Sequence, residues 1–126
     1  QRTVDDILTG TSFQDVYSSD YSQKTKYGNV VVFFYDDSMG GDNYSTRLAQ
    51  IYAKVEPSFK DKITFLKYFN IKNNPFAVGL GVTTIPYTLF YKNGKVIDKF
   101  VGGPKPDFHL NVWVDDFRRE ISKLYK

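Results

Sequence analysis

The sequence of 126 residues contains no cysteine and one histidine. Without a thiol, the chain cannot form a disulfide, a thiolate-bound metal site or a thiol nucleophile of its own. No apolar run approaches the roughly 20 residues that a membrane-spanning helix needs. The net charge is only +3, and lysine and arginine are interleaved with acidic residues instead of clustered. We therefore expect no membrane span within this sequence and no nucleic-acid partner.

The length is typical of one domain with a single core, and 41% of the residues are hydrophobic. Residues 1–28 are polar and carry faint helical patterns, so we predict an N-terminal helical extension followed by the main domain over 29–126, within one domain overall. The patterns run through Val4, Ile7 and Leu8, and through Phe13, Val16 and Tyr17. Since the sequence begins with Gln1 and not with methionine, we expect either a processed product or a trimmed piece of a longer chain. Removal of a targeting segment would favour an extracytoplasmic or organelle-lumen location, and the sequence itself does not specify the compartment.

The rest of the chain alternates between strand and helix patterns. The continuous apolar run 29–35 is typical of a strand that is covered on both faces, and 63–69 predicts a second strand. Between them, spacings of 4, 3 and 4 predict one buried helix face. Asn74-Pro75 predicts the start of a short helix, and apolar spacing predicts a C-terminal helix of about 20 residues. The two apolar helix faces comprise Tyr44, Leu48, Ile51 and Val55, and Leu110, Trp113, Val114, Phe117, Ile121 and Leu124.

The clearest local signal is Asn93-Gly94 between the strand-like runs 87–91 and 96–101. A tight hairpin turn needs a positive φ at both central residues, which Asn-Gly adopts readily. The two earlier strands are joined by a helix and must be parallel, so the hairpin supplies the antiparallel edge. The sequence therefore predicts an α/β sandwich with a mixed sheet between helices.

This order, with Thr84-Ile85-Pro86, an aromatic strand, Lys92-Asn93-Gly94 and Gly102, resembles the thioredoxin family over roughly residues 28–125. The resemblance implies a thioredoxin-like three-layer sandwich, a cis Ile85–Pro86 bond and an open Ile85 backbone beside the loop 37–41. In the family that loop carries the Trp-Cys-Gly-Pro-Cys motif.

Carried over residue by residue, the family's tryptophan falls on Asp37, its nucleophilic cysteine on Ser38 and its resolving cysteine on Gly41. The pair between the cysteines falls on Met39 and Gly40, and the buried acid that assists proton transfer falls on Val32. Thiol–disulfide exchange requires an attacking thiolate and a resolving thiol, and the serine hydroxyl is far too weak an acid to replace the first. We therefore expect a vacated active site, no thiol–disulfide oxidoreductase activity and no cofactor.

Other chemistry for this loop has weaker support. Ser38 has no evident base, because His109 lies at the start of the C-terminal helix. Asp36, Asp37, Asp42 and Asn43 do not follow the order of a calcium loop, so we expect helix capping and no metal. Asn43-Tyr44-Ser45 fits the glycosylation triplet, but the first turn of a helix is a poor acceptor.

We expect a redox-inactive binding module, with a chaperone-like role, that holds a peptide or protein partner in the groove beside the vacated loop. By resemblance, the groove residues are Asp37, Ser38, Met39, Gly40, Phe76, Ile85, Pro86 and Tyr87, with Tyr35 also near. An extended peptide gripped by its backbone suits such a groove. Two alternatives remain: a structural part of a larger assembly with the groove unused, or an oxidoreductase homologue whose cysteines were replaced.

Overall fold

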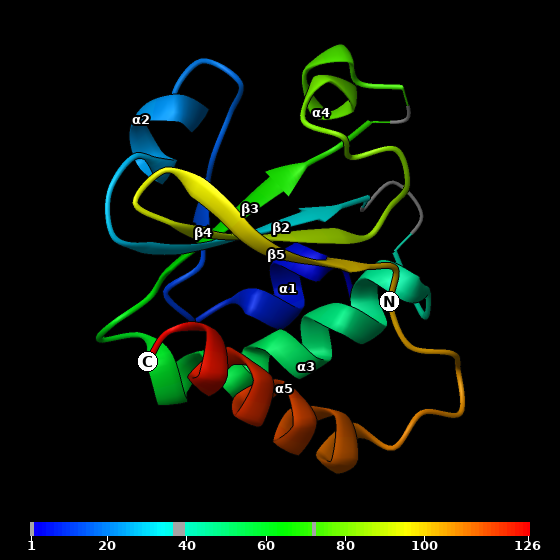
Figure 1. The fold of residues 1–126 in the computed structure, drawn as a ribbon. Coiled ribbons are helices and arrows are strands. Elements are labelled where there is room, and N and C mark those ends of the chain that lie inside the picture. The colour runs from blue at the N-terminus through cyan, green and yellow to red at the C-terminus, as the bar shows by residue number, and fades with distance from the viewer. Residues whose placement is uncertain (1, 37–39, 72) are drawn as a thin grey trace.

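The fold was obtained as a computed structural model that describes residues 2–36, 40–71 and 73–126 (Figure 1). Its helices are α1 (Val4–Leu8), α2 (Tyr21–Thr25), α3 (Tyr44–Phe59), α4 (Pro75–Gly79) and α5 (Leu110–Leu124). Its strands are β1 (Gln14–Asp15), β2 (Asn29–Tyr35), β3 (Thr64–Phe69), β4 (Tyr87–Lys92) and β5 (Lys95–Val101). No helix within the described ranges is long and apolar enough to cross a membrane.

The strands form one mixed sheet in the order β1-β3-β2-β4-β5. Strands β1, β3 and β2 are parallel, whereas β4 runs antiparallel to β2 and β5 antiparallel to β4. Val32 in the central strand pairs with Leu66 on one side and Leu89 on the other. The predicted α/β class, with a parallel crossover and an antiparallel hairpin at the edge, is confirmed.

Helices cover both faces of this sheet (Figure 1). Alternate residues of β2 divide between two apolar clusters. Val31, Phe33 and Tyr35 pack toward α1, α3 and α5, and Val32 and Phe34 pack toward α2 and α4. Burial of each such side chain contributes about 1.5–3 kcal/mol. The continuous apolar run that predicted a doubly covered strand is thus explained by the two cores.

Buried tyrosine hydroxyls connect the helices to the sheet. The hydroxyl oxygens of Tyr52 on α3 and Thr88 on β4 lie 2.6 Å apart, and burial raises the pKa of Tyr52 above its usual value. Tyr125, just after α5, donates to the carbonyl oxygens of Tyr91 and Val30 at 2.9 and 3.2 Å. A buried hydroxyl without a partner would be costly, so these bonds fix where α3 and α5 rest.

The N-terminal segment belongs to the same folded unit. Helix α1 contributes Val4, Ile7 and Leu8 to the core, as the first helical pattern predicted. The second predicted helix, through Phe13 and Val16, is wrong, because this stretch forms β1 at the sheet edge before α2 begins.

Lys67 on β3 joins α1 and β1 to the sheet. Its ammonium pairs with Asp5 of α1 and, at 2.9 Å, with Asp15 of β1. Burial by itself would lower the pKa of Lys67, but the two carboxylates outweigh this effect and raise it. The charged form is therefore favoured, and one ammonium links three elements.

The predicted hairpin joins β4 to β5. Asn93 and Gly94 have φ values of 50° and 84°, as a tight primed turn requires. The turn also contacts the segment before β2, because Asn93 and Gly28 exchange two hydrogen bonds of 2.9 Å. A Cβ at Gly94 would lie 3.2 Å from the carbonyl oxygen of Lys26. Glycine at this position thus serves both the turn and the close approach.

Candidate functional site

The loop that follows β2 is the position at which the resemblance implies a vacated redox motif. At its start the Asp36 amide donates to the Ser45 hydroxyl at 3.2 Å, and near its end the Gly41 amide donates to the Arg2 carbonyl at 3.0 Å. The predicted site residues Asp37, Ser38 and Met39 lie outside the described residues. Gly41, where a resolving cysteine would stand, carries no side chain and is fixed through its backbone.

Helix α3 begins at Tyr44, after the whole loop, and its N-terminus is closed by its own side chains. Asn43 Oδ1 accepts from the Thr46 amide at 2.9 Å, and the Thr46 hydroxyl accepts from the Asn43 amide at 2.9 Å. This reciprocal cap satisfies two of the free N–H groups that make a helix N-terminus attractive to anions. Of the loop residues for which helix capping was expected, Asn43 caps α3.

The side chains of Asn43 and Asp42, which were considered for glycosylation and for cation binding, both have partners within the protein. The Asn43 side-chain nitrogen donates to the Gly40 carbonyl at 3.1 Å, so the amide of the glycosylation triplet is engaged on both sides. Asp42 accepts from Arg47 at 2.9 Å and is thus already paired. Across the described part of the chain, no group of three or more metal-ligating side chains could hold an ion.

Val32, onto which the resemblance carries the family's buried acid, is completely buried. Its neighbours in the α2–α4 core are apolar or aromatic, including Phe34, Leu66 and Leu89. A valine there can neither give nor take a proton.

The Ile85–Pro86 peptide bond is cis, and Pro86 is buried where β4 begins. The Pro86 carbonyl accepts from the Gly102 amide at 2.9 Å, which joins this corner to the end of β5. Gly103 packs against the same corner: a Cβ there would lie 2.7 Å from the Tyr44 carbonyl oxygen and 3.4 Å from Pro86 Cγ. Residues Pro86, Gly103 and Tyr44 are therefore held in close contact beside the loop.

A hollow of about 440 Å³ opens next to this corner, at the end of β2 and β3. Ile85 lies at its edge and is only partly buried. Within the described residues, the backbone amide and carbonyl of Ile85 take part in no hydrogen bond. The lining residues are Asp36, Asn70, Asn73, Asn74, Val78, Val82, Thr83, Thr84 and Ile85.

Asn70 gives this hollow an unusual feature. Its side chain is buried, with 4% exposed, and its Oδ1 atom accepts no hydrogen bond. Its backbone amide donates to the Tyr35 carbonyl at 2.8 Å and so fixes the residue at the ends of β2 and β3. Buried acceptors almost always have a donor, so this unpaired oxygen, on a residue that lines the hollow, is exceptional.

The other predicted groove residues are placed differently from one another. Tyr87 is 5% exposed and belongs to the core beneath α2 and α4. Phe76 is partly buried and stacks on Tyr68 with ring centroids 5.8 Å apart. Tyr35 is 2% exposed, and its hydroxyl donates to Asp5 at 3.0 Å. Of the described groove residues, Ile85 thus lines the hollow, whereas these aromatic side chains pack within the protein.

Arg47 was missed by the sequence reasoning. It is buried, and its Nε donates to the Pro104 carbonyl at 2.7 Å, while its guanidinium lies over the Tyr44 ring at 4.5 Å. Together with the Asp42 pair, these contacts tie the start of α3 to the segment after β5. An arginine one turn into an amphipathic helix is normally exposed, so its spacing gave no signal.

The comparisons with known proteins agree with this fold. The structure is similar to that of thioredoxin from Malassezia sympodialis, Mala s 13, described as a member of a pan-allergen family. The TM-score is 0.63, and the alignment covers 92% of this chain and 93% of that one, at 22% sequence identity. A five-stranded mixed sheet with helices on both faces and Pro86 beside the loop defines a thioredoxin fold.

The sequence model of the thioredoxin family matches residues 11–116. The chain therefore belongs to the thioredoxin family. No sequence among curated proteins matches it. Because the full sequence has no cysteine, this member lacks the two thiols that disulfide exchange requires.

Proposed function

We propose that this protein is a redox-inactive thioredoxin-family module that binds an extended segment of a partner protein in the hollow beside Ile85. The observation that carries the proposal is that two residues with unsatisfied hydrogen-bonding groups line the same cavity. The Ile85 backbone has both hydrogen-bonding groups free among the described residues, and Asn70 Oδ1 is buried without a donor.

An extended peptide offers what these groups need. A strand laid beside Ile85 donates and accepts through its backbone, as in recognition by strand addition. A side-chain amide or hydroxyl of the same peptide would donate to Asn70 Oδ1 once the atoms that cover this buried oxygen move aside. Val78 and Val82 give the cavity an apolar wall, which favours a small or medium side chain beside the polar one.

Peptides selected from a displayed random library on the immobilised protein provide the test. Val78 lines the hollow and is 50% exposed, so Val78→Glu can place a charge there without disturbing the core. Val112, on α5, is 58% exposed and lies away from the hollow, so Val112→Glu is the matched control.

We expect selected peptides to bind the unmodified protein and the Val112→Glu variant equally in calorimetric titrations, and Val78→Glu at least ten-fold more weakly. Asn70→Leu removes the acceptor. It should therefore reduce the affinity for peptides that carry a side-chain donor more than the affinity for matched peptides in which a methyl group replaces the donor. Failure to enrich any peptide, or an equal loss in both valine variants, would refute the proposal and favour a structural role with the groove unused.

A further inference from the structure

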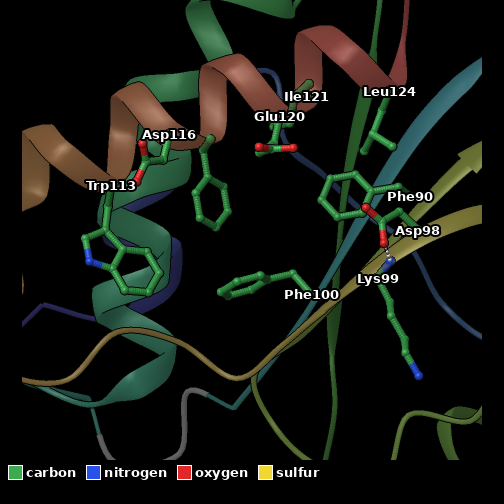
Figure 2. A pocket seen from close by; sticks show the side chains of 10 residues that line it. Phe90, Asp98, Lys99, Phe100, Trp113, Asp116, Glu120, Ile121 and Leu124 are labelled. Carbon is green, nitrogen blue, oxygen red and sulfur yellow. Dashed lines mark hydrogen bonds between the residues drawn. The ribbon is translucent and has the colours of Figure 1, made fainter.

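A second hollow, of about 490 Å³, lies between β5 and α5 (Figure 2). Helix α5 packs on the face of the sheet opposite α4 (Figure 1). Its walls are aromatic. The rings of Phe100 and Trp113 are 6.1 Å apart and nearly perpendicular, and both contact Phe117, at 5.1 and 6.0 Å. Phe117 is buried, but Phe100 and Trp113 are only half-buried, so ring surface is open to the hollow.

The rim of this hollow is acidic. Asp98 comes from β5, and Asp116 and Glu120 come from α5 one turn apart (Figure 2). Lys99 also lines the hollow, but its side chain extends away from the rings (Figure 2). Three carboxylates around one cavity contrast with the net charge of +3 of the whole chain.

Among the described residues, the partners of these carboxylates lie close to them in the sequence and are exposed to solvent. Asp116 pairs with Arg119, and Glu120 lies 3.7 Å from Lys123, one turn further along α5. These residues are more than half exposed on their side chains, and exposed pairs of this kind contribute little. Asp98 accepts from the neighbouring Lys99 amide at 2.8 Å. A bound cation would compete only with these exposed local pairs for the carboxylates along the hollow.

Strand β5 gives a partner access to the hollow. It is the last strand of the sheet, and among the described residues it pairs with β4 alone, which leaves its other edge without a strand partner there. Every side chain of β5 except Phe100 is exposed. An extended segment added at this edge would carry alternate side chains toward the face on which Phe100 lies.

We propose that this hollow binds an arginine side chain of a partner protein, presented by an extended segment at the free edge of β5. The planar guanidinium stacks on aromatic rings and forms paired hydrogen bonds with carboxylates. The site therefore offers the two kinds of surface that arginine uses: the faces of Trp113 and Phe100, and the carboxylates of Asp98, Asp116 and Glu120. It is separate from the hollow beside Ile85, so either proposal can fail alone.

Acetylated and amidated heptapeptides with a central arginine, flanked by threonine and glutamine, are suitable probes. Matched peptides carry lysine or neutral citrulline at the centre. Trp113 is the only tryptophan in the chain, so its fluorescence and its indole N–H resonance report directly on this hollow. We expect the arginine peptide to perturb both signals, the lysine peptide to bind more weakly, and citrulline to bind at least ten-fold more weakly than arginine.

Charge-removing variants locate the site. Glu120→Gln and Asp98→Asn should each reduce the affinity for the arginine peptide by about three- to ten-fold. Added salt should reduce this affinity further. Asp115→Asn is the control, since Asp115 is exposed on α5 and does not line the hollow. Val78→Glu, in the other hollow, should have no effect.

The proposal is overturned if citrulline binds as well as arginine, or if Asp115→Asn costs as much as Glu120→Gln. It is also overturned if no peptide perturbs Trp113 at millimolar concentration, or if Val78→Glu abolishes binding. Circular dichroism and the unfolding midpoint of each variant establish that a loss of binding does not come from a loss of fold.

Discussion

The hydroxyl groups of Tyr52 and Thr88 lie 2.6 Å apart at the contact between α3 and the central sheet, and both residues are completely buried. Neither hydroxyl can exchange this partner for water without opening the core. The pair therefore fixes the position of α3, the helix that follows the vacated loop.

Tyr52→Phe should destabilise the protein. It leaves the buried Thr88 hydroxyl without its partner, which costs about 1–3 kcal/mol. Urea unfolding followed by circular dichroism measures the difference in the free energy of unfolding. Tyr17 is 60% exposed, so Tyr17→Phe should change that free energy by less than about 0.5 kcal/mol. Equal effects in the two variants would contradict the role assigned to the pair.

Stability should fall as the pH rises above 10. Burial raises the pKa of Tyr21, Tyr52, Tyr91 and Tyr125 in the folded protein above the ordinary value of 10.0. At alkaline pH the unfolded chain therefore binds fewer protons than the folded one, and unfolding is favoured. Below pH 10 both states keep these protons, and the contribution is fully present.

Tyr52 supplies a direct check of this pH dependence. Each proton released on unfolding lowers the free energy of unfolding by about 1.4 kcal/mol per pH unit. Tyr52→Phe should make the decline between pH 10 and 12 shallower by about one proton, measured by urea titrations at successive pH values. An unchanged slope would show that Tyr52 keeps an ordinary pKa in the fold.

Gly103→Ala should destabilise the corner beside Pro86. The new Cβ would lie 2.7 Å from the Tyr44 carbonyl oxygen, so backbone must move apart. Overpacking of this kind costs about 1–3 kcal/mol, and thermal unfolding should show a lower midpoint. The matched control is Gly79→Ala, because nothing lies within 4 Å of a Cβ at Gly79. A midpoint as high as that of the control would indicate that the corner is loosely packed.

Arg47→Lys should be destabilising although it keeps the charge. A lysine ammonium cannot reproduce the Nε bond to Pro104, the bond to Asp42 and the flat contact with Tyr44 together. We expect a loss of about 1–3 kcal/mol in urea unfolding. Asp42→Asn should cost less than 1 kcal/mol, because the Asp42 side chain is 67% exposed. If Asp42→Asn destabilised the protein more than Arg47→Lys, the ion pair between Arg47 and Asp42 would be the main contribution of Arg47.

Insulin reduction by dithiothreitol should proceed at the same rate with and without the protein. The reaction needs a thiolate and a resolving thiol, and the chain contains neither. A cysteine-containing thioredoxin serves as the positive control. Acceleration by this protein would reveal a chemistry that no residue described above provides.

The sequence predicted the central part of the fold because its signals are local. After Asn29, the run 30–35 is apolar or aromatic throughout since both faces of β2 are covered, and Asn93-Gly94 formed the predicted turn. Asn74 caps α4 through its side chain, with Pro75 as the first helical residue. Each of these features is decided by neighbours in the chain.

Features that depend on distant residues were missed. Strand β1 consists of Gln14 and Asp15, both exposed, and it is held by residues distant in sequence: it pairs with Leu66 and Lys67 of β3, and the Lys67 ammonium pairs with the Asp15 carboxylate. Tyr44 was predicted on the buried face of α3, but it is 49% exposed and is covered by the Arg47 guanidinium. Helix α5 is also shorter than predicted, with 15 residues.

The candidate site could be predicted only as a region. The cis Pro86 and the adjoining loop follow from the family resemblance, but the hollow is assembled from Asp36, Asn70, Val78 and Ile85, on separate elements. Nothing in the sequence distinguishes Asn70, whose unsatisfied oxygen gives the hollow its character, from the neighbouring asparagines. Only tertiary packing determines which amide loses its partner.

The ammonium of Lys67 holds Asp5 and Asp15 at once. Acylation of this one amine would remove both attractions in a single chemical event and leave two carboxylates facing each other across a neutral amide. Lysine-directed reagents should therefore modify Lys67 slowly in the intact protein. Once Lys67 is modified, proteases should cut the segment between α1 and β1 earlier than they do in the unmodified protein.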